Sequence, residues 1–236
     1  EKIISVAVTP CTAKKAEIAR EELCDAGKLL NIEEMRDNDY VITTKELVQW
    51  CQEEGLDLDK ITPSKFDSVL GEGTGAGMIF GNTGGVMEAA LRTVYRVLEG
   101  KEAPADFYQL RPVRGLSNRK EAEVTIAGKK LRVCILYGTA AAEKFLAEDM
   151  NGYHFVEVMT CPGGCISGAG QPDCGSVPVS DVVRKKRIQS LYQADEQAER
   201  RNSMDNPEIG TIYHEFFKEP LSMLSEKLLH TTYKGK

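Results

Sequence analysis

The sequence predicts an α/β fold in which a lobe with a small mixed or parallel sheet flanked by helices is followed by a mostly helical C-terminal segment. Short apolar, β-branched stretches of strand length alternate with longer helical stretches. Two of the strand-like stretches lead directly into a cysteine. After Pro178 the chain becomes polar and helical in composition. We therefore expect one lobe over residues 1–178 and a helical wrapping segment over residues 179–236.

The first hundred residues are predicted to alternate between strands and helices. Thr44 is a suitable N-cap for the helix that follows it, and Gly100 is a suitable stop for the last helix. The glycine-rich stretch between the helix after Thr44 and the helix that ends at Gly100 is predicted to be a loop. The expected elements are a buried strand at 3–10, a helix at 12–24, a strand at 39–44, a helix at 45–56, a loop at 61–85 and a helix at 86–100.

The second half is predicted to begin with a β-hairpin over residues 122–138. Its strands alternate in polarity and turn at Ala127-Gly128. The remaining expected elements are a helix at 139–149, a strand at 153–159 and helices over 180–230, with breaks at Pro207 and Pro220.

Composition excludes several classes of function. The 236 residues carry a net charge of −6, so no electrostatic footprint for nucleic acid is present. The basic run from Arg184 to Arg187 is expected to be a solvated helix face. No stretch approaches the roughly 20 apolar residues of a membrane span. No signal peptide is predicted, and seven cysteines cannot all pair, so we expect a reducing cytoplasm.

The first residues, "EKIISVAV", enter directly as a strand with no preceding cap or turn. A natural chain rarely begins in this way. We therefore expect the sequence to be part of a longer protein.

The stretch "MTCPGGCISGAGQP" (159–172) places Cys161 and Cys165 four residues apart among four glycines. Thiolates are preferred ligands of zinc and iron–sulfur clusters, and glycine allows the backbone to approach a bulky inorganic group. Zinc is disfavoured because the three histidines have no partner spacing. A radical-SAM cluster is excluded because Gly168 replaces its third cysteine. Two buried thiols in a turn are the simpler alternative.

A third cysteine follows the first predicted strand in "TPCTAKKAE" (9–17). Cys11 lies near a predicted helix start, where amide dipoles stabilise a thiolate. Lys14, one turn later, could offer a cation to an anion held there, although a surface lysine is the simpler interpretation. Each of these two predicted strands is followed at its end by a cysteine. Their thiolates are therefore expected to meet at one site.

The remaining motifs carry less information. The glycine-rich stretch 71–85 matches no complete phosphate-binding motif. Cys24, Cys51 and Cys134 are expected to be packed. Cys174, nine residues after Cys165, is a candidate extra ligand.

Together these residues resemble the active-site domain of iron-only (FeFe) hydrogenases. One family signature reads roughly M-P-C-x-x-K-x-x-E, and another roughly E-x-M-x-C-x-x-G-C-x-x-G-G-G-Q-P. The first is matched by Pro10, Cys11, Lys14 and Glu17, and the second by Glu157, Met159, Cys161, Gly164, Cys165, Gly168, Gly170, Gln171 and Pro172. The segments 79–93 and 228–233 also resemble family members, so the resemblance covers essentially the whole chain.

The resemblance implies an H-cluster, a 4Fe–4S cube joined through one cysteine to a di-iron unit with CO, cyanide and a dithiolate. Cys11, Cys161 and Cys165 match cluster ligands, with Cys165 in the bridging place. Lys14 matches the lysine that hydrogen-bonds a cyanide. Phe80 and Met159 match apolar residues of the di-iron pocket. The implied reaction is the reversible reduction of protons to hydrogen.

Two departures from the family pattern concern the cluster surroundings. Thr9 stands where many members have methionine, and Ala169 replaces the middle glycine of the GGG run. A hydroxyl beside the di-iron unit would change its hydrogen bonding. Altered catalytic bias or a sensory, low-turnover role therefore stays open.

The family's first signature, roughly T-S-C-C-P-x-W, does not occur in the sequence. It would supply the fourth cluster ligand and the cysteine that transfers protons. We therefore expect the C-terminal part of a hydrogenase catalytic domain from an anaerobic bacterium, inactive without its N-terminal lobe and with its metal cluster absent or incomplete. The implied partners are a ferredoxin-like electron donor or electron-transfer domains, and maturation proteins. The rival interpretation is a hydrogenase-like iron–sulfur assembly factor.

Overall fold

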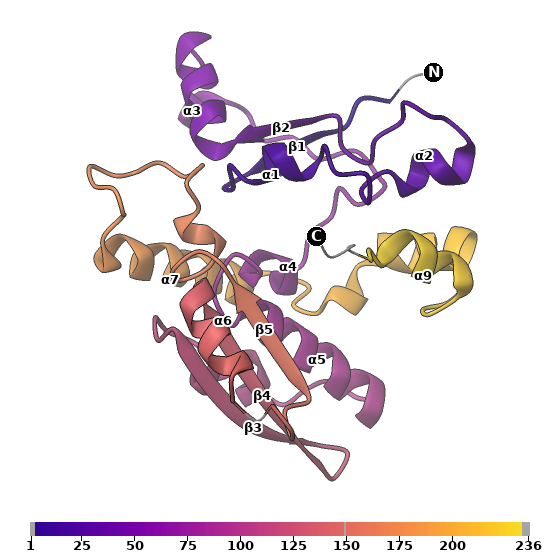
Figure 1. Ribbon diagram of the computed structural model, residues 1–236. Helices are drawn as coiled ribbons and strands as arrows, with labels where there is room; N and C mark the ends of the chain where they lie inside the picture. Colours follow the sequence, from indigo (N-terminus) through magenta and orange to yellow (C-terminus); the bar gives the residue numbers. More distant parts are fainter. Residues whose placement is uncertain (1–2, 149, 233–236) are drawn as a thin grey trace. The chain divides into compact units, whose positions relative to one another are not determined.

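The computed structural model describes residues 3–148 and 150–232, which divide into two compact units. Unit 1 contains the described residues of 1–66, 169–172 and 208–236, and unit 2 contains those of 67–168 and 173–207. Each unit has a small sheet flanked by helices (Figure 1). The predicted α/β class is therefore confirmed, whereas the division of the chain at residue 178 stays a prediction.

Unit 2 is built on a mixed, three-stranded sheet in the order β3-β4-β5. Strands β3 (Arg119–Ile126) and β4 (Lys129–Tyr137) form the predicted hairpin. Ala127 and Gly128 have φ values of 50° and 71°, as a tight turn of this hand requires. Strand β5 (Phe155–Met159) runs parallel to β4.

Strand β4 is the centre of unit 2 because both of its faces are covered (Figure 1). Val133 and Ile135 pack in the cluster that includes Met87 and Leu91 of helix α5 (Gly85–Glu99). The alternate residues Cys134 and Leu136 pack with helix α6 (Thr139–Leu146). Residue 149, the predicted end of this helix, lies outside the described residues.

The predicted loop 61–85 is wrong in one respect, because it contains helix α4 (Gly75–Ile79). The Thr74 side chain caps this helix by accepting a hydrogen bond from the Gly77 amide. Ala76 and Ile79 are buried beside Tyr192 of helix α7 (Asp181–Gln197). Packing against a distant part of the chain thus overrides the low helix propensity of glycine.

The remaining elements of unit 2 are short 3₁₀ turns. They are Ala105–Tyr108, Arg111–Val113, Cys165–Ser167 and Ser203–Asp205.

Unit 1 has a parallel pair of strands, β1 (Val6–Thr9) and β2 (Tyr40–Thr43). The strand predicted at 3–10 is shorter than expected and is not buried, since Val6 and Val8 are 50% and 51% exposed. With a single neighbouring strand, β1 has little to cover its outer face. The helices of unit 1 are α1 (Lys14–Glu17), α2 (Asp25–Leu30), α3 (Thr44–Glu53), α9 (Met223–Leu229) and all but the first residue of α8 (Pro207–Ile212), with a 3₁₀ turn at Leu58–Lys60 and a π-helical turn at Tyr213–Phe217.

Two predictions for unit 1 need correction. The helix expected over 12–24 ends at Glu17, because it buries no residue that could stabilise a longer one. The N-cap of α3 is Thr43, one residue before the predicted Thr44. Thr43 accepts a hydrogen bond from the Glu46 amide, and the Glu46 carboxylate accepts one from the Thr43 amide.

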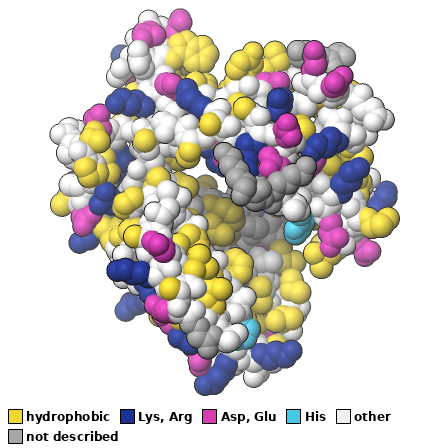
Figure 2. Space-filling model, viewed as in Figure 1, with side chains coloured by type: hydrophobic (Ala, Val, Ile, Leu, Met, Phe, Trp, Pro, Cys, Tyr) yellow, Lys and Arg dark blue, Asp and Glu magenta, His cyan; other side chains and the backbone are white. Residues whose placement is uncertain are grey.

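The predicted helical character of residues 180–230 is confirmed by α7, α8 (Pro207–Ile212) and α9. Helix α8 begins at Pro207, as the fixed φ of proline favours. No helix in the described part of the chain combines the length and the hydropathy needed to cross a membrane. Basic and acidic side chains are interspersed over the face shown in Figure 2.

Candidate functional site

The cysteine loop of unit 2 begins where β5 ends. The Met159 carbonyl accepts a hydrogen bond from the Gly138 amide at 2.8 Å, which fixes the end of the strand. Cys161 follows two residues later and is half-buried, and Cys165 begins a 3₁₀ turn and is exposed. One short loop therefore carries both predicted thiolate ligands.

Backbone hydrogen bonds close this loop on itself. The Gly164 amide donates to the Cys161 carbonyl at 3.0 Å, and the Gly168 amide donates to the Cys165 carbonyl at 2.9 Å. Gly163 and Gly164 have φ values of 82° and 101°. A Cβ atom on Gly164 would lie 2.6 Å from the Gly81 carbonyl oxygen, so only glycine fits at this position.

The glycine-rich segment after α4 supports the cysteine loop from outside. The Ile166 amide donates to the Gly81 carbonyl at 3.1 Å, and the Thr83 amide donates to the Gly163 carbonyl at 3.0 Å. This glycine-rich segment was not expected to bind phosphate. It instead supports the loop that carries the two cysteines.

Glu157 ties this support to β5. Its buried carboxylate accepts hydrogen bonds from the Gly84 amide at 2.6 Å and the Met87 amide at 2.8 Å. These amides lie at the N-terminus of α5, where a negative charge is favoured. Burial nevertheless raises the pKa of Glu157 above its usual value.

Lys120 of β3 holds the same segment from the other side. Its ammonium donates to the Thr83 carbonyl at 2.9 Å and to the Gly115 carbonyl at 3.1 Å. Burial lowers the pKa of Lys120 to about 8, and the charge of Glu157 opposes this shift. Residues 81–87 are thus fixed by two buried side chains from two strands.

Replacing Gly164 by alanine is expected to destabilise unit 2 and displace the cysteine loop. The new Cβ would collide with the Gly81 carbonyl and would require an unfavourable φ. We expect a loss of about 1–3 kcal/mol, typical of strained backbone, measured by urea unfolding. Gly73→Ala is the matched control, because Gly73 has open space around its Cβ position. Equal stability of the two variants would contradict the prediction.

The two predicted apolar pocket residues both lie in unit 2. Phe80 follows α4 directly and is 46% exposed. Met159 is the last residue of β5 and is half-buried. Their roles beside a di-iron unit stay predictions.

Cys11 lies in unit 1, directly after β1, and is half-buried. The Thr9 hydroxyl donates to the Cys11 carbonyl at 3.2 Å and accepts from the Cys11 amide at 3.4 Å. The Gly170 amide donates to the Pro10 carbonyl at 2.9 Å. The Gly-Gln-Pro ending of the cysteine motif is therefore packed beside the other cysteine motif, within one unit.

The Lys14 ammonium lies 2.8 Å from the Glu17 carboxylate, and the two side chains are 47% and 32% exposed. The two charged residues of the shorter signature therefore form an ion pair on one turn of helix. The three cysteines that match cluster ligands are thus divided between the units, with Cys161 and Cys165 in unit 2 and Cys11 in unit 1. Within neither unit do three described Cys, His, Asp or Glu side chains gather around a potential metal ion.

The other cysteines differ in their surroundings. Cys134 is fully buried, as predicted, and burial raises its pKa. Cys24 and Cys51, which were also expected to be packed, are half-buried. Cys174 is exposed, and its sulfur accepts a hydrogen bond from Arg187 at 3.4 Å. Its role as a ligand stays a prediction.

A buried charge cluster joins α5 to α7 and was not predicted. Arg92 donates to both carboxylate oxygens of Asp195 at 2.8 Å and to Glu88 at 2.7 Å, and all three side chains are 0% exposed. Arg114 and Arg201 complete the cluster. Glu88 and Arg92 have the spacing of an ion pair on one helix turn, but sequence alone does not show that it is buried.

The basic run on α7 was predicted to be a solvated face, which holds for Lys185 and Lys186 only. Arg187 donates to the Ile166 carbonyl at 2.8 Å, and Arg184 donates to the Ser167 hydroxyl at 3.3 Å. Both arginines therefore contact the cysteine loop.

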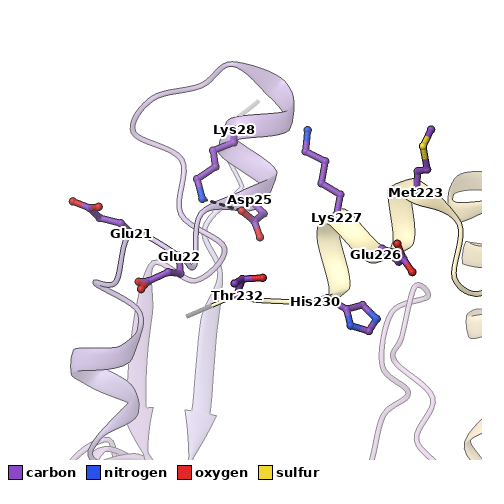
Figure 3. A pocket seen from close by; sticks show the side chains of 9 residues that line it. All are labelled: Glu21, Glu22, Asp25, Lys28, Met223, Glu226, Lys227, His230 and Thr232. Carbon is purple, nitrogen blue, oxygen red and sulfur yellow. Dashed lines mark hydrogen bonds and ion pairs between the residues drawn. The ribbon is translucent and has the colours of Figure 1, made fainter. Parts of the chain in front are cut away.

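A cavity of about 680 Å³ in unit 1 is lined by charged residues of the α2 and α9 regions (Figure 3). Lys28 pairs with Asp25 there at 2.9 Å. The lining residues are Glu21, Glu22, Asp25, Lys28, Met223, Glu226, Lys227, His230 and Thr232. None of these lining residues belongs to the cysteine motifs. We therefore place the candidate functional site at the cysteines and not at this cavity.

Two family models match the chain. Residues 1–169 match "Iron only hydrogenase large subunit, C-terminal domain", and residues 181–236 match "Iron hydrogenase small subunit". Iron hydrogenase 1 of Clostridium pasteurianum is 37% identical over an alignment of 238 positions, which covers 99% of this chain and 40% of that protein. The NADP-reducing hydrogenase subunit HndD of Solidesulfovibrio fructosivorans is 41% identical over 99% of this chain and 38% of its own length.

A third relative, the cytosolic Fe-S cluster assembly factor narfl of Xenopus tropicalis, is 29% identical over 98% of this chain and 48% of its own length. Among solved structures, a variant of the [FeFe]-hydrogenase HydA1 from Chlamydomonas reinhardtii has a TM-score of 0.75 and 32% identity. The match covers 98% of this chain and 63% of the HydA1 chain. The chain spans about 40% of the two hydrogenases named first. It belongs to the family of the iron-only hydrogenase large subunit, C-terminal domain.

Proposed function

We propose that this chain forms part of the H-cluster site of an iron-only hydrogenase that interconverts protons, electrons and hydrogen. The observation that carries the proposal is the glycine-closed loop with Cys161 and Cys165, supported through Glu157 and Lys120. Such support from buried polar groups is what a fixed inorganic ligand requires.

The residues present fit an iron–sulfur cluster. All three matched donors are sulfur atoms, the usual protein ligands of iron–sulfur clusters, and the glycine at position 164 keeps the backbone close to its support. Cys11, Cys161 and Cys165 would hold the 4Fe–4S part, with Cys165 as the bridge to the di-iron unit. When bound, the H-cluster would pass on electrons from a donor and would offer the open iron site at which hydrogen is made or split. Three residues lie between Cys165 and Ala169. Ala169 is the first residue of the segment 169–172, which belongs to the same unit as Cys11.

The other matched residues would act around the cluster. Lys14 would exchange its Glu17 partner for an anionic cyanide, because an ammonium donor forms a strong hydrogen bond to such an anion. Phe80 and Met159 would exclude water from the di-iron unit. The Thr9 hydroxyl would remain bonded to the Cys11 backbone, which leaves it unavailable as a proton donor.

Three matched thiolates and no matched proton-transfer cysteine are present. We infer that the chain is active only together with a polypeptide that carries the T-S-C-C motif. Maturation proteins would deliver the di-iron unit, and a ferredoxin-like partner or electron-transfer domains would supply electrons. We expect the active protein in the cytoplasm, although one relative, 42% identical over 73% of this chain, is named a periplasmic hydrogenase.

The test is anaerobic production with a polypeptide that carries the missing motif and with the maturation proteins. Hydrogen evolution and infrared bands of metal-bound CO and cyanide are expected. Cys165→Ser is expected to abolish both signals and to lower the iron content, because the bridging thiolate is lost. Cys51→Ser on α3 is the control and should retain them. Activity in Cys165→Ser equal to that of the control would refute the proposal.

The alternative function is iron–sulfur assembly, which is favoured by the similarity to the assembly factor of Xenopus tropicalis. The same experiment separates the two. A stable iron–sulfur cluster without infrared bands would support the assembly function, and bands with almost no turnover would support a sensory hydrogenase.

A further inference from the structure

Helix α7 contacts the cysteine loop through Arg184 and Arg187. The proposed function assigns no role to this contact. We propose that Arg187 holds the cysteine loop in position and raises the reduction potential of the cluster bound there. The part of this proposal that concerns the potential rests on the proposed function. The part that concerns the loop does not.

The position of Arg187 follows from its hydrogen bonds. Its Nη1 donates to the carbonyl of Ile166, the residue directly after Cys165, at 2.8 Å. Its Nη2 donates to the Cys174 sulfur at 3.4 Å. Ile166 is only 4% exposed, and its own amide donates to Gly81. The guanidinium is therefore anchored beside the backbone that carries the proposed bridging ligand.

The charge of Arg187 is the second part of the argument. Arginine is charged at any pH at which proteins fold. A 4Fe–4S cluster with thiolate ligands is anionic, and reduction adds one more negative charge. A positive charge held nearby stabilises the reduced form more than the oxidised form, which raises the reduction potential. Because Arg187 is half-buried, salt screens this interaction less than at an exposed site.

Arg184 is a weaker candidate for the same effect. It donates to the Ser167 hydroxyl at 3.3 Å, but its Nη1 lies 2.6 Å from the Asp181 carboxylate. A neighbouring carboxylate offsets much of its positive charge. We therefore assign the effect on the potential to Arg187.

The neighbouring Lys186 provides a matched control. Lys186 is exposed on the same helix, one residue from Arg187. Lys186→Gln and Arg187→Gln thus remove the same charge from the same helix, but only Arg187→Gln removes the hydrogen bond to the loop. Arg187→Lys keeps the charge and loses the planar fork of donors.

The first measurement is amide hydrogen exchange in the metal-free chain. Exchange at residues 164–168 is expected to be faster in Arg187→Gln than in the wild type, and unchanged in Lys186→Gln. Equal exchange in the two glutamine variants would overturn the positioning role.

The second measurement is the midpoint potential of the cluster, followed by electron paramagnetic resonance. The chain would be reconstituted with iron and sulfide in the presence of the polypeptide that carries the T-S-C-C motif. Arg187→Gln is expected to have a lower potential than the wild type, with Arg187→Lys between them and Lys186→Gln unchanged. Equal potentials in the two glutamine variants would overturn the electrostatic role. If the wild type assembles no cluster, the proposed function fails, while the exchange measurement still decides the positioning role.

Discussion

Replacing Asp195 by asparagine is expected to lower the free energy of unfolding of unit 2 by about 3–5 kcal/mol, the usual cost of breaking a buried ion pair. Both Asp195 oxygens accept hydrogen bonds from Arg92 at 2.8 Å, and both side chains are 0% exposed. The substitution leaves a buried guanidinium with Glu88 as its main counter-charge. Because this helix contact is fully buried, water does not replace the lost carboxylate as a partner of the Arg92 guanidinium.

The pKa of Asp195 points in the same direction. Burial alone would raise this pKa, but hydrogen bonds from Arg92 and Arg201 outweigh it and lower the pKa below its usual value. A carboxylate with a lowered pKa stabilises the fold above its unfolded pKa, and this contribution is lost as the pH falls through the folded pKa. The Asp195→Asn variant should therefore lose less stability on acidification than the wild type.

Glu123→Gln is the matched control for Asp195→Asn. Glu123 pairs with Lys130 across the hairpin at 3.0 Å, with side chains 54% and 75% exposed, so its loss should cost no more than about 1 kcal/mol. The single tryptophan, Trp50, lies in unit 1. Unfolding of unit 2 is therefore measured by hydrogen exchange at β4 in increasing urea. An equal cost for the two variants would contradict the prediction.

Replacing Glu157 by glutamine is expected to cost about 2–3 kcal/mol and to loosen the cysteine loop, because one buried amide loses its acceptor. The carboxylate now accepts from both Gly84 and Met87, and a glutamine side chain offers an oxygen to only one of them. The substitution also removes the buried negative charge that supports the ammonium of Lys120.

The measurement for Glu157→Gln is amide exchange at Gly84, Met87 and residues 163–168, together with urea unfolding. Faster exchange is expected at all of these positions, since Thr83 connects the Glu157 segment to Gly163. Glu143→Gln, an exposed carboxylate on α6, is the control. Faster exchange at Gly84 without any change at 163–168 would show that Glu157 does not support the cysteine loop.

Where short-range patterns decide the structure, the sequence was sufficient. The hairpin of β3 and β4 follows from alternating polarity and from Ala127-Gly128, which adopt the positive φ values of its turn. Helix α5 ends at Gly100, whose φ of 68° glycine adopts without strain. The spacing of Cys161 and Cys165 among glycines likewise predicts the cysteine loop.

Where contacts join distant parts of the chain, only the tertiary structure decided the outcome. Helix α4 forms within a glycine-rich segment because the Gly75 and Ala76 amides donate to the carbonyls of Arg200 and Arg201. Composition gives no sign of such partners.

The same division applies to the candidate site. Its thiolates were identified by spacing along the chain, which a sequence records directly. Its supports, Glu157, Lys120 and Arg187, act through hydrogen bonds to backbone atoms of residues 21 to 73 positions away. Backbone amides and carbonyls are the same in every residue and leave no pattern in a sequence. The sequence by itself therefore predicted the candidate ligands, whereas tertiary packing decided which buried residues support their loop.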